Sequence, residues 1–274
     1  MTKIHTKTVA QVESLWIYPI KSCRGISIQT MQIDKLGPLY DRNWMIVDQN
    51  GVFVTQRKFP KMARIETFLL KDMLTITIDG FGQENVTFID SQKLKAEMQS
   101  VKIWQDEVTA INGTTRVDAL LSDFLKSPVK LVQIDKHNPR LRQKEDIEFT
   151  VGFADSRPFL LTNIASHEDL SNRVGEDIPI SRFRPNIVIK NQSAYSEDEW
   201  ESLKIGNIEF RQSVACDRCI IPTVDQKTGE KTGAEPLKTL KSYRLHSKSI
   251  VFGRRLVHKN PGLIQIGDLV KAHE

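Results

Sequence analysis

The chain has 274 residues, of which 39% are hydrophobic and 27% charged, and this composition excludes a disordered tail, a fibrous protein and a disulfide-stapled miniprotein. Its 39 basic and 34 acidic residues give a net charge of +5, but they form no concentrated basic stripe, so we expect no nucleic-acid partner. An anionic small molecule or an acidic protein fits this charge better. No apolar run reaches the ~18 residues of a membrane span, and an odd number of cysteines cannot form a disulfide framework. We therefore expect a cytoplasmic protein without a membrane partner.

Short alternating segments separated by turn residues predict a strand-rich unit over residues 1–128. The expected strands cover residues 12–18, 26–33, 44–47, 52–55, 74–78 and 101–104. Asn50 and Gly51 tolerate the positive φ of a hairpin turn, which we place between two of these strands. A helix is expected over residues 117–125, because their apolar side chains recur at helical spacing.

Residues 129–274 have a mixed helix and strand pattern and predict a second unit. Residues 136–148 are polar and charged, so we expect an exposed loop there. Ser166 and Asp169 have the spacing of a capping box and predict a helix over residues 166–174. The remaining expected elements are a strand over residues 186–189, a short helix over 195–203, a strand over 208–210, and a last strand pair over 262–270 joined by Gly267 and Asp268.

Cys216 and Cys219 form a Cys-x-x-Cys pair, which is typical of structural zinc, a redox dithiol or a single working thiolate. Zinc needs four ligands, but the remaining cysteine is Cys23 and no histidine stands at a suitable spacing. A dithiol would open a helix, whereas a proline interrupts the segment after Cys219. Arg218 lies between the two cysteines and would favour a thiolate. The residues alone leave open that both thiols are simply small buried side chains.

Several hydrogen-bond donors stand in turns that flank strands. They belong to three expected turns: Lys21, Ser22 and Arg24 in the first, Arg42 in the second, and Arg184 with Asn186 in the third. A single arginine at a strand end usually points to solvent or pairs with an acid. Several such groups in a mildly basic chain predict a site for an anion, because guanidinium groups bind phosphate in a bidentate manner.

In this order and spacing, the motifs resemble the MOSC proteins, named for the C-terminal domain of molybdenum-cofactor sulfurase, and within them the amidoxime-reducing-component and YcbX-like branch. The segments that carry the resemblance are residues 18–25 (YPIKSCRG), 41–47 (DRNWMIV), 55–57 (TQR), 183–188 (FRPNIV), 216–225 (CDRCIIPTVD), 237–244 and 252–253. The resemblance implies a mainly β (α+β) fold. An N-terminal β-barrel domain over residues 1–128 would pack on a β-rich MOSC barrel domain over residues 129–274, with a few helices.

The resemblance also implies a molybdenum cofactor, Mo-molybdopterin, with the thiolate of Cys219 as the molybdenum ligand and catalytic residue. It assigns no direct metal role to Cys216. The positions that hold the pterin and its phosphate are matched by Lys21, Ser22, Arg42, Arg184 and Asn186, and less closely by Asp155 and Ser156. We add Arg218 to the cofactor-binding residues because it stands beside the thiolate.

The implied activity is the reduction of N-hydroxylated compounds, namely amidoximes, hydroxylamines and N-hydroxylated bases, by oxygen-atom transfer to the Cys-ligated molybdenum, which is a detoxification reaction. The chain lacks the cysteines of a ferredoxin domain, so we expect no Fe–S cluster and a separate electron donor, a ferredoxin-, flavodoxin- or cytochrome b5-type system. Pyridoxal phosphate is not expected. Two alternatives stay open. One is a non-redox carrier that holds sulfur or molybdenum cofactor on Cys219 as a persulfide or thiolate, and the other is a binding protein that kept the fold without the chemistry.

Overall fold

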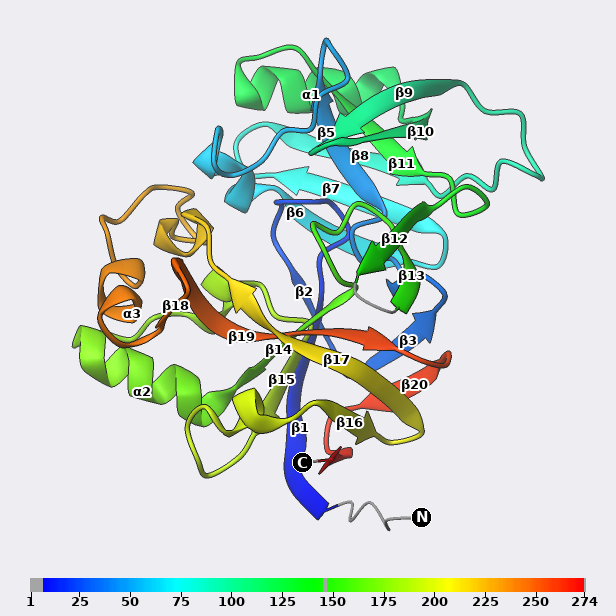
Figure 1. The fold of residues 1–274 in the computed structure, drawn as a ribbon. Helices are drawn as coiled ribbons and strands as arrows, with labels where there is room; N and C mark the ends of the chain where they lie inside the picture. Colours follow the sequence, from blue (N-terminus) through cyan, green and yellow to red (C-terminus); the bar gives the residue numbers. More distant parts are fainter. Residues whose placement is uncertain (1–6, 145–146, 274) are drawn as a thin grey trace.

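Seven strands form a closed β-barrel in the computed structural model, which describes residues 7–144 and 147–273 (Figure 1). Around the barrel, each strand pairs with the next in the order β14 (Phe159–Asn163), β15 (Ile187–Lys190), β1 (Lys7–Ile17), β21 (Leu269–His273), β16 (Ser202–Ile205), β17 (Ile208–Asp217) and β19 (Ser249–His258). The barrel is closed because β19 also pairs with β14. Strands β14 and β15 are parallel. Inward-pointing apolar side chains, among them Leu15, Phe210 and Leu256, fill the barrel interior, as in other small closed barrels.

The N-terminal unit contains two smaller sheets around a separate core. One sheet has the order β5 (Trp44–Asp48), β11 (Val129–Ile134), β10 (Asp106–Asn112) and β9 (Met98–Ile103), and the other contains β6 (Glu66–Leu70), β7 (Met73–Ile78) and β8 (Gly82–Thr87). Helix α1 (Thr115–Leu125) lies at the top of Figure 1 and packs against β11 and β8. Its buried Leu121 and Phe124 share this core with Ile46 and Leu74.

Shorter elements connect and cover the two units. Strand β2 (Ile26–Ile28) pairs with β1, β18 (Leu245–His246) pairs with β19, β12 (Arg140–Lys144) pairs with β13 (Ile147–Val151), and β3 (Thr30–Asp34) pairs with both β4 (Gly37–Pro38) and β20 (Gly262–Gln265). Helices α2 (Ile164–Val174) and α3 (Leu237–Tyr243) lie side by side at one flank of the barrel (Figure 1). Four 3₁₀ turns cover Pro60–Arg64, Ile180–Phe183, Ser196–Glu199 and Ile221–Thr223.

Two strands pair with the unit on the other side of the expected boundary at residue 128. Strand β1 precedes that boundary but closes the seven-stranded barrel, whereas β11 follows it and pairs with β5 and β10 of the N-terminal unit. The chain therefore crosses from one unit to the other immediately after β1, where Ile20 bridges to Trp44. This crossing places residues 18–24 at the junction of the units. The division at residue 128 stays a prediction.

Much of the expected organisation is confirmed. The fold is mainly β with a few helices, and strands or helices lie at residues 44–47, 74–78 and 117–125 as expected. Gly51 has a φ of 71° and stands in the expected turn after β5. Helix α3 was not expected from the sequence. Over the described residues, none of the helices is both long enough and apolar enough to span a bilayer.

The expectation of an exposed loop over residues 136–148 is wrong, because β12 and β13 form a hairpin there. Residues 145–146 of that segment lie outside the described residues. Arg140 is 4% exposed, and its guanidinium donates to Asp106 and to the carbonyl oxygens of Gly152 and Ala154. A buried cation with satisfied donors can occupy a strand, which a count of polar residues does not reveal.

Three further boundaries differ from the sequence prediction. Helix α2 begins at Ile164, because the side chain of Asn163 rather than Ser166 accepts the first free N–H, that of Ala165. The expected helix over residues 195–203 is a single 3₁₀ turn followed by β16, which pairs with two barrel strands. Strands β20 and β21 do not pair with each other, since the turn at Gly267 sends them to different sheets.

Two of the expected strands are incomplete. Residues 52–55 form only isolated bridges, from Val52 to Lys102 and from Phe53 to Val47. Residues 26–33 divide into β2 and β3, which pair with different partners. Both segments change sheets within a few residues, and local alternation of apolar side chains cannot show such a change.

Candidate functional site

A pocket with a volume of about 140 Å³ opens at the junction of the two units. All nine site residues expected from the sequence line it, namely Lys21, Ser22, Arg42, Asp155, Ser156, Arg184, Asn186, Arg218 and Cys219. Arg24, which the sequence grouped with them, is not among the lining residues and instead binds Glu66 and the carbonyl oxygen of Gln226. The structure thus brings together turns that are far apart in the sequence, while their roles toward a ligand stay predictions.

The pocket is strongly cationic. Its lining contains six basic side chains and two acidic ones: Lys21, Arg42, Arg157, Arg184, Arg218 and Arg255, with Asp155 and Asp217. Asp217 is already paired with Arg255, at 3.6 Å between its Oδ2 and Nη1. The remaining positive charge suits a small anion that accepts several hydrogen bonds.

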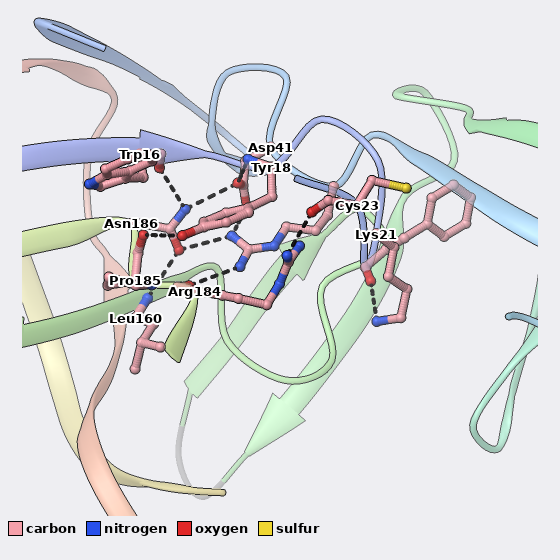
Figure 2. Close-up of polar contacts among 11 residues, drawn as sticks. Trp16, Tyr18, Lys21, Cys23, Asp41, Leu160, Arg184, Pro185 and Asn186 are labelled. Atoms are coloured by element: carbon pink, nitrogen blue, oxygen red, sulfur yellow. Dashed lines mark hydrogen bonds and ion pairs between the residues drawn. The ribbon is translucent and has the colours of Figure 1, made fainter. Parts of the chain in front are cut away.

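Tyr18 contacts two of these arginines, Arg42 and Arg184, and Figure 2 shows Tyr18 and Arg184 close together. The guanidinium carbons of Arg42 and Arg184 lie 4.4 and 4.2 Å from the centroid of its buried ring, a distance suited to cation–π attraction. The Tyr18 hydroxyl donates to the carbonyl oxygen of Pro185 at 3.1 Å. Burial raises the pKa of Tyr18 to about 12, so the phenol stays neutral. Both arginines have a positive φ, of 51° and 59°, a conformation uncommon for residues other than glycine.

Asn186 fixes the same cluster through all four hydrogen-bonding positions of its amide. Its Nδ2 donates to the carbonyl oxygen of Trp16 at 3.2 Å and to Asp41 Oδ1 at 3.1 Å. Its Oδ1 accepts from Arg42 Nη1 at 3.0 Å and from the N–H of Leu160 at 3.2 Å. Figure 2 shows these bonds converging on the amide. Asn186 therefore acts as a positioning residue for Arg42, and direct contact with a ligand stays a prediction.

Lys21 supplies a buried ammonium group on another side of the pocket. Its Nζ donates to the carbonyl oxygen of Phe153 at 2.8 Å and forms an ion pair with Asp155. Burial lowers the pKa of Lys21 to about 8, against the opposing effect of Asp155. For Asp155, burial acts to raise the pKa, but the ion pair with Lys21 outweighs it and the pKa lies below its usual value. Both groups are therefore charged at pH 7.

The three cysteines have different surroundings. Both Cys216 and Cys219 line the pocket, but Cys219 is exposed in the segment after β17, whereas Cys216 is buried on that strand. Arg218 donates to Cys216 Sγ at 3.1 Å and to the carbonyl oxygen of Phe183 at 2.8 Å. Its guanidinium is thus directed at the first cysteine of the pair. Burial raises the pKa of Cys23 to about 12, so the accessible thiol of the pocket is that of Cys219.

Comparison with known proteins decides the family. Residues 9–128 match the family described as the MOSC N-terminal beta barrel domain, and residues 148–271 match the MOSC domain. The chain is 34% identical to mitochondrial amidoxime-reducing component 1 of Homo sapiens over 96% of its length and 82% of that protein. It is 33% identical to mitochondrial amidoxime reducing component 2 of Bos taurus, over 96% and 83% of the two chains. The chain belongs to the MOSC family, in the branch of the amidoxime-reducing components.

The pocket of this MOSC protein fits an anionic cofactor, as its unpaired donors indicate. Arg184 donates from Nη1 to the carbonyl oxygen of Cys23 at 2.6 Å, but its Nη2 is buried without a partner. Nε of Arg218 is also buried without a partner. An unsatisfied buried donor costs about 1–3 kcal/mol, and a ligand with acceptor oxygens would remove this cost. Burial and the charge of Arg42 lower the pKa of Arg184 to about 10, so the guanidinium is still charged.

Sequence reasoning missed several residues of this MOSC site. Tyr18 was read only as part of a strand and a motif, although it stacks on two arginines. Arg157 and Arg255 line the pocket as well. A lone arginine in a strand or loop gives no signal of its own, and only the proximity of Arg157 to Ser156 could have pointed to it. In the described part of the chain, no group of three or more His, Cys, Asp and Glu side chains could hold a metal.

Proposed function

We propose that this protein is a molybdenum-cofactor-dependent reductase of N-hydroxylated compounds such as amidoximes, hydroxylamines and N-hydroxylated bases. The observation that carries the proposal is that an exposed thiol, Cys219, shares one pocket with the cationic groups of Lys21, Arg42 and Arg184. A cofactor with a thiolate-ligated metal and an anionic tail needs both kinds of group in one place. The names of the relatives, amidoxime-reducing components, support the reaction class.

The residues present divide into two roles toward such a cofactor. Cys219 Sγ would ligate the molybdenum, since soft sulfur ligands suit such centres. Arg42, Arg184 and Lys21 would bind the phosphate and the pterin, and Ser22 and Ser156 would add hydroxyl donors from the pocket wall. When bound, the cofactor supplies the two-electron chemistry that takes the oxygen atom from the substrate N–O bond.

The overall reaction uses two electrons and two protons, converts the N–OH group to N–H and releases water. The chain's own groups bind, orient and exclude solvent, because the chemistry resides in the cofactor. Lys21 Nζ keeps its proton near neutral pH, since its pKa of about 8 lies above 7. It therefore stays a cation next to the bound anion during turnover.

Electrons would come from a separate ferredoxin-, flavodoxin- or cytochrome b5-type protein. Of the three cysteines, Cys23 and Cys216 are buried and Cys219 is assigned to molybdenum, which leaves no set for an Fe–S cluster in this chain. A net charge of +5 suits an acidic partner. We place the protein in the cytoplasm as part of the proposal, whereas the names of its relatives place those proteins in mitochondria.

Metal analysis of protein made in a cofactor-competent host tests the proposal. We expect close to one molybdenum per wild-type chain and turnover of benzamidoxime with an artificial electron donor, with both lost in Cys219→Ala. Cys216→Ser is the matched control, because it keeps an acceptor for Arg218 and leaves Cys219 in place. Low molybdenum in wild type and Cys219→Ala alike would contradict the proposal.

The exposure of Cys219 also suits the alternative function, a carrier that hands sulfur or cofactor to another enzyme. A thiol that exchanges a ligand with a partner protein must be accessible. The carrier predicts a persulfide on Cys219, seen as the mass of one added sulfur atom, and no turnover of benzamidoxime. Intact-mass spectrometry of freshly purified protein therefore separates the two functions.

A further inference from the structure

Trp104 occupies a position at which a tryptophan is unfavourable for the fold. Ile103 pairs with Asp106 across the β9–β10 hairpin, so Trp104 and Gln105 form its two-residue turn. The φ of Trp104 is 58°, in the region that such turns usually give to glycine or asparagine. A bulky residue there is a backbone outlier. The residue is also 49% exposed, so burial of the side chain does not offset the backbone strain.

Three neighbours hold the indole in one orientation. Its Nε1 donates to Asp155 Oδ1 at 2.8 Å. The guanidinium of Arg57 lies 4.5 Å from its ring centroid, and the ring of Phe53 lies 5.1 Å away at an angle of 52°. Phe53, Arg57 and Trp104 are named the aromatic rim below. The indole is thus both fixed and open, as a preformed binding surface should be.

The aromatic rim adjoins the cationic pocket through Asp155. The carboxylate of Asp155 accepts from Trp104 and pairs with Lys21, and Asp155 lines the pocket. Lys21 Nζ lies 5.7 Å from the ring centroid of Phe53. The side chain of Asp155 is 53% exposed, so this edge of the pocket is open to solvent. A ligand that extends from the pocket past Asp155 therefore meets Trp104.

The edge of the pocket offers a hydrogen-bond acceptor and an aromatic surface without a large net charge. The ionised carboxylate of Asp155 is balanced by Lys21, with which it pairs, and the guanidinium of Arg57 lies over the indole. An amidoxime is neutral, and its N–H groups can donate to a carboxylate. An aromatic group attached to it is planar and can stack on an indole. Phe53 and Trp104 also border a shallow hollow beside Gln105 on the same hairpin.

We propose that the aromatic rim is a stacking subsite at the pocket mouth, in which Trp104 selects N-hydroxylated substrates that carry a planar aromatic group. The inference rests on the proposed function, because it assigns a substrate preference to the same pocket. In this proposal, the strained turn places the indole beside Asp155. Trp104 is then a residue that determines specificity, and the reaction at the cofactor does not depend on it.

Kinetics with a pair of substrates test the preference. Benzamidoxime and acetamidoxime share the reacting group but differ in the aromatic ring. We expect Trp104→Ala to lower kcat/KM for benzamidoxime about tenfold, mainly through KM, as loss of one stacking contact does, and to change acetamidoxime less than twofold. Trp104→Phe keeps an aromatic ring, so its kcat/KM for benzamidoxime should stay close to that of wild type. An equal loss for both substrates, or none for either, would overturn the proposal.

Binding without turnover separates this inference from the proposed function. Trp104 is the most exposed of the four tryptophans, so benzamidoxime should quench its fluorescence, acetamidoxime should not, and Trp104→Phe should abolish the quenching. If wild type does not reduce benzamidoxime but shows this pattern, the proposed function fails and the subsite stands. Lower molybdenum content in Trp104→Phe, with far-UV circular dichroism unchanged, would instead assign the rim to the cofactor and overturn the subsite.

Discussion

The parallel strands β14 and β15 have a buried polar cluster at each end, and the two clusters differ in what they leave unpaired. At the ends where the strands begin, Arg184 and Asn186 join Tyr18, Asp41 and Arg42, and Arg184 keeps a buried N–H group without a partner. At the ends where the strands finish, every side-chain nitrogen and oxygen of Asn163, Ser166 and Glu197 is hydrogen-bonded. Burial is thus common to both clusters.

In the Tyr18 cluster, the unpaired donor belongs to Arg184, which lines the pocket, whereas Asn163, Ser166 and Glu197 have no unpaired side-chain atom. Glu197 is 1% exposed and accepts from Ser166 Oγ at 2.7 Å and from Asn163 Nδ2 at 3.2 Å, which ties α2 to the turn before β16. Such a saturated network stabilises the fold and has no donor for a ligand. In the Tyr18 cluster, Nη2 of Arg184 has no partner and lowers stability unless a ligand accepts its hydrogen bond. Substitutions in the two clusters should therefore separate ligand binding from stability.

The largest effect on binding is expected for Arg184→Met. The variant loses a charge-assisted contact, so we expect the molybdenum content to fall about tenfold or more. The apo protein should be as stable as wild type or more so, because a buried guanidinium that faces Arg42 is removed. Inductively coupled plasma mass spectrometry and thermal melting measure the two quantities. Arg24→Met, outside the pocket, is the matched control. If Arg184→Met were less stable than wild type but kept the wild-type molybdenum content, Arg184 would serve the fold and not the ligand, and the contrast between the two clusters would be wrong.

Glu197→Ala should give the opposite result. It leaves the buried donors of Ser166 and Asn163 unpaired, so we expect a loss of about 2–3 kcal/mol in the free energy of unfolding. Urea titration measures this loss. The molybdenum content of the folded fraction should stay at the wild-type level. Glu199→Ala removes an exposed carboxylate two residues away and should change stability by less than about 0.5 kcal/mol. Equal effects of the two substitutions would show that the network contributes nothing.

The buried ammonium group of Lys21 makes the free energy of unfolding depend on pH. Its pKa is about 8 in the folded protein against 10.5 as the ordinary value, so between these values the unfolded chain binds more protons. The contribution of Lys21 to stability therefore rises with pH across this window, by on the order of 1–3 kcal/mol, whereas the raised pKa values of Cys23 and Tyr18 act in the opposite direction above about pH 9. Lys21→Met should remove that rise, whereas Lys238→Met, at an exposed position, should retain it. Urea titrations of wild type and both variants at pH 7.5 and pH 10 decide this, and the same pH dependence in wild type and Lys21→Met would disprove the assignment.

Sequence reasoning reached the pocket because its members belong to compact motifs. Residues 18–25 and 216–219 each bring a donor or thiol to a strand end, and alternation of apolar residues located most strands of both units. It failed where pairing is long-range. The hairpin β12–β13 is stabilised by Arg140 and Asp106, which are 34 residues apart, and β1 crosses between units. Neither leaves a local pattern in the chain.

The same limit explains why the supporting residues of the site were not found. Tyr18 and Trp104 act through stacking and a strained turn, and both properties depend on partners that are distant in sequence. The donors that line the pocket could be recognised by residue type, whereas the aromatic rings that contact them could not. The contacts that preorganise this site could therefore be identified only from the structure.

The smallest expected effect is that of Tyr18→Phe, which tests how the arginines are held. The variant loses the hydrogen bond to Pro185 but keeps the ring that contacts Arg42 and Arg184. We expect a loss of about 1 kcal/mol in stability and an unchanged molybdenum content, because stacking, the ion pair with Asp41 and the hydrogen bond to Asn186 still position Arg42. Tyr18→Leu removes the ring, so its molybdenum content should fall toward that of Arg184→Met. If Tyr18→Phe already lost the metal, the hydroxyl would belong to the ligand site and the ring alone would not be the support.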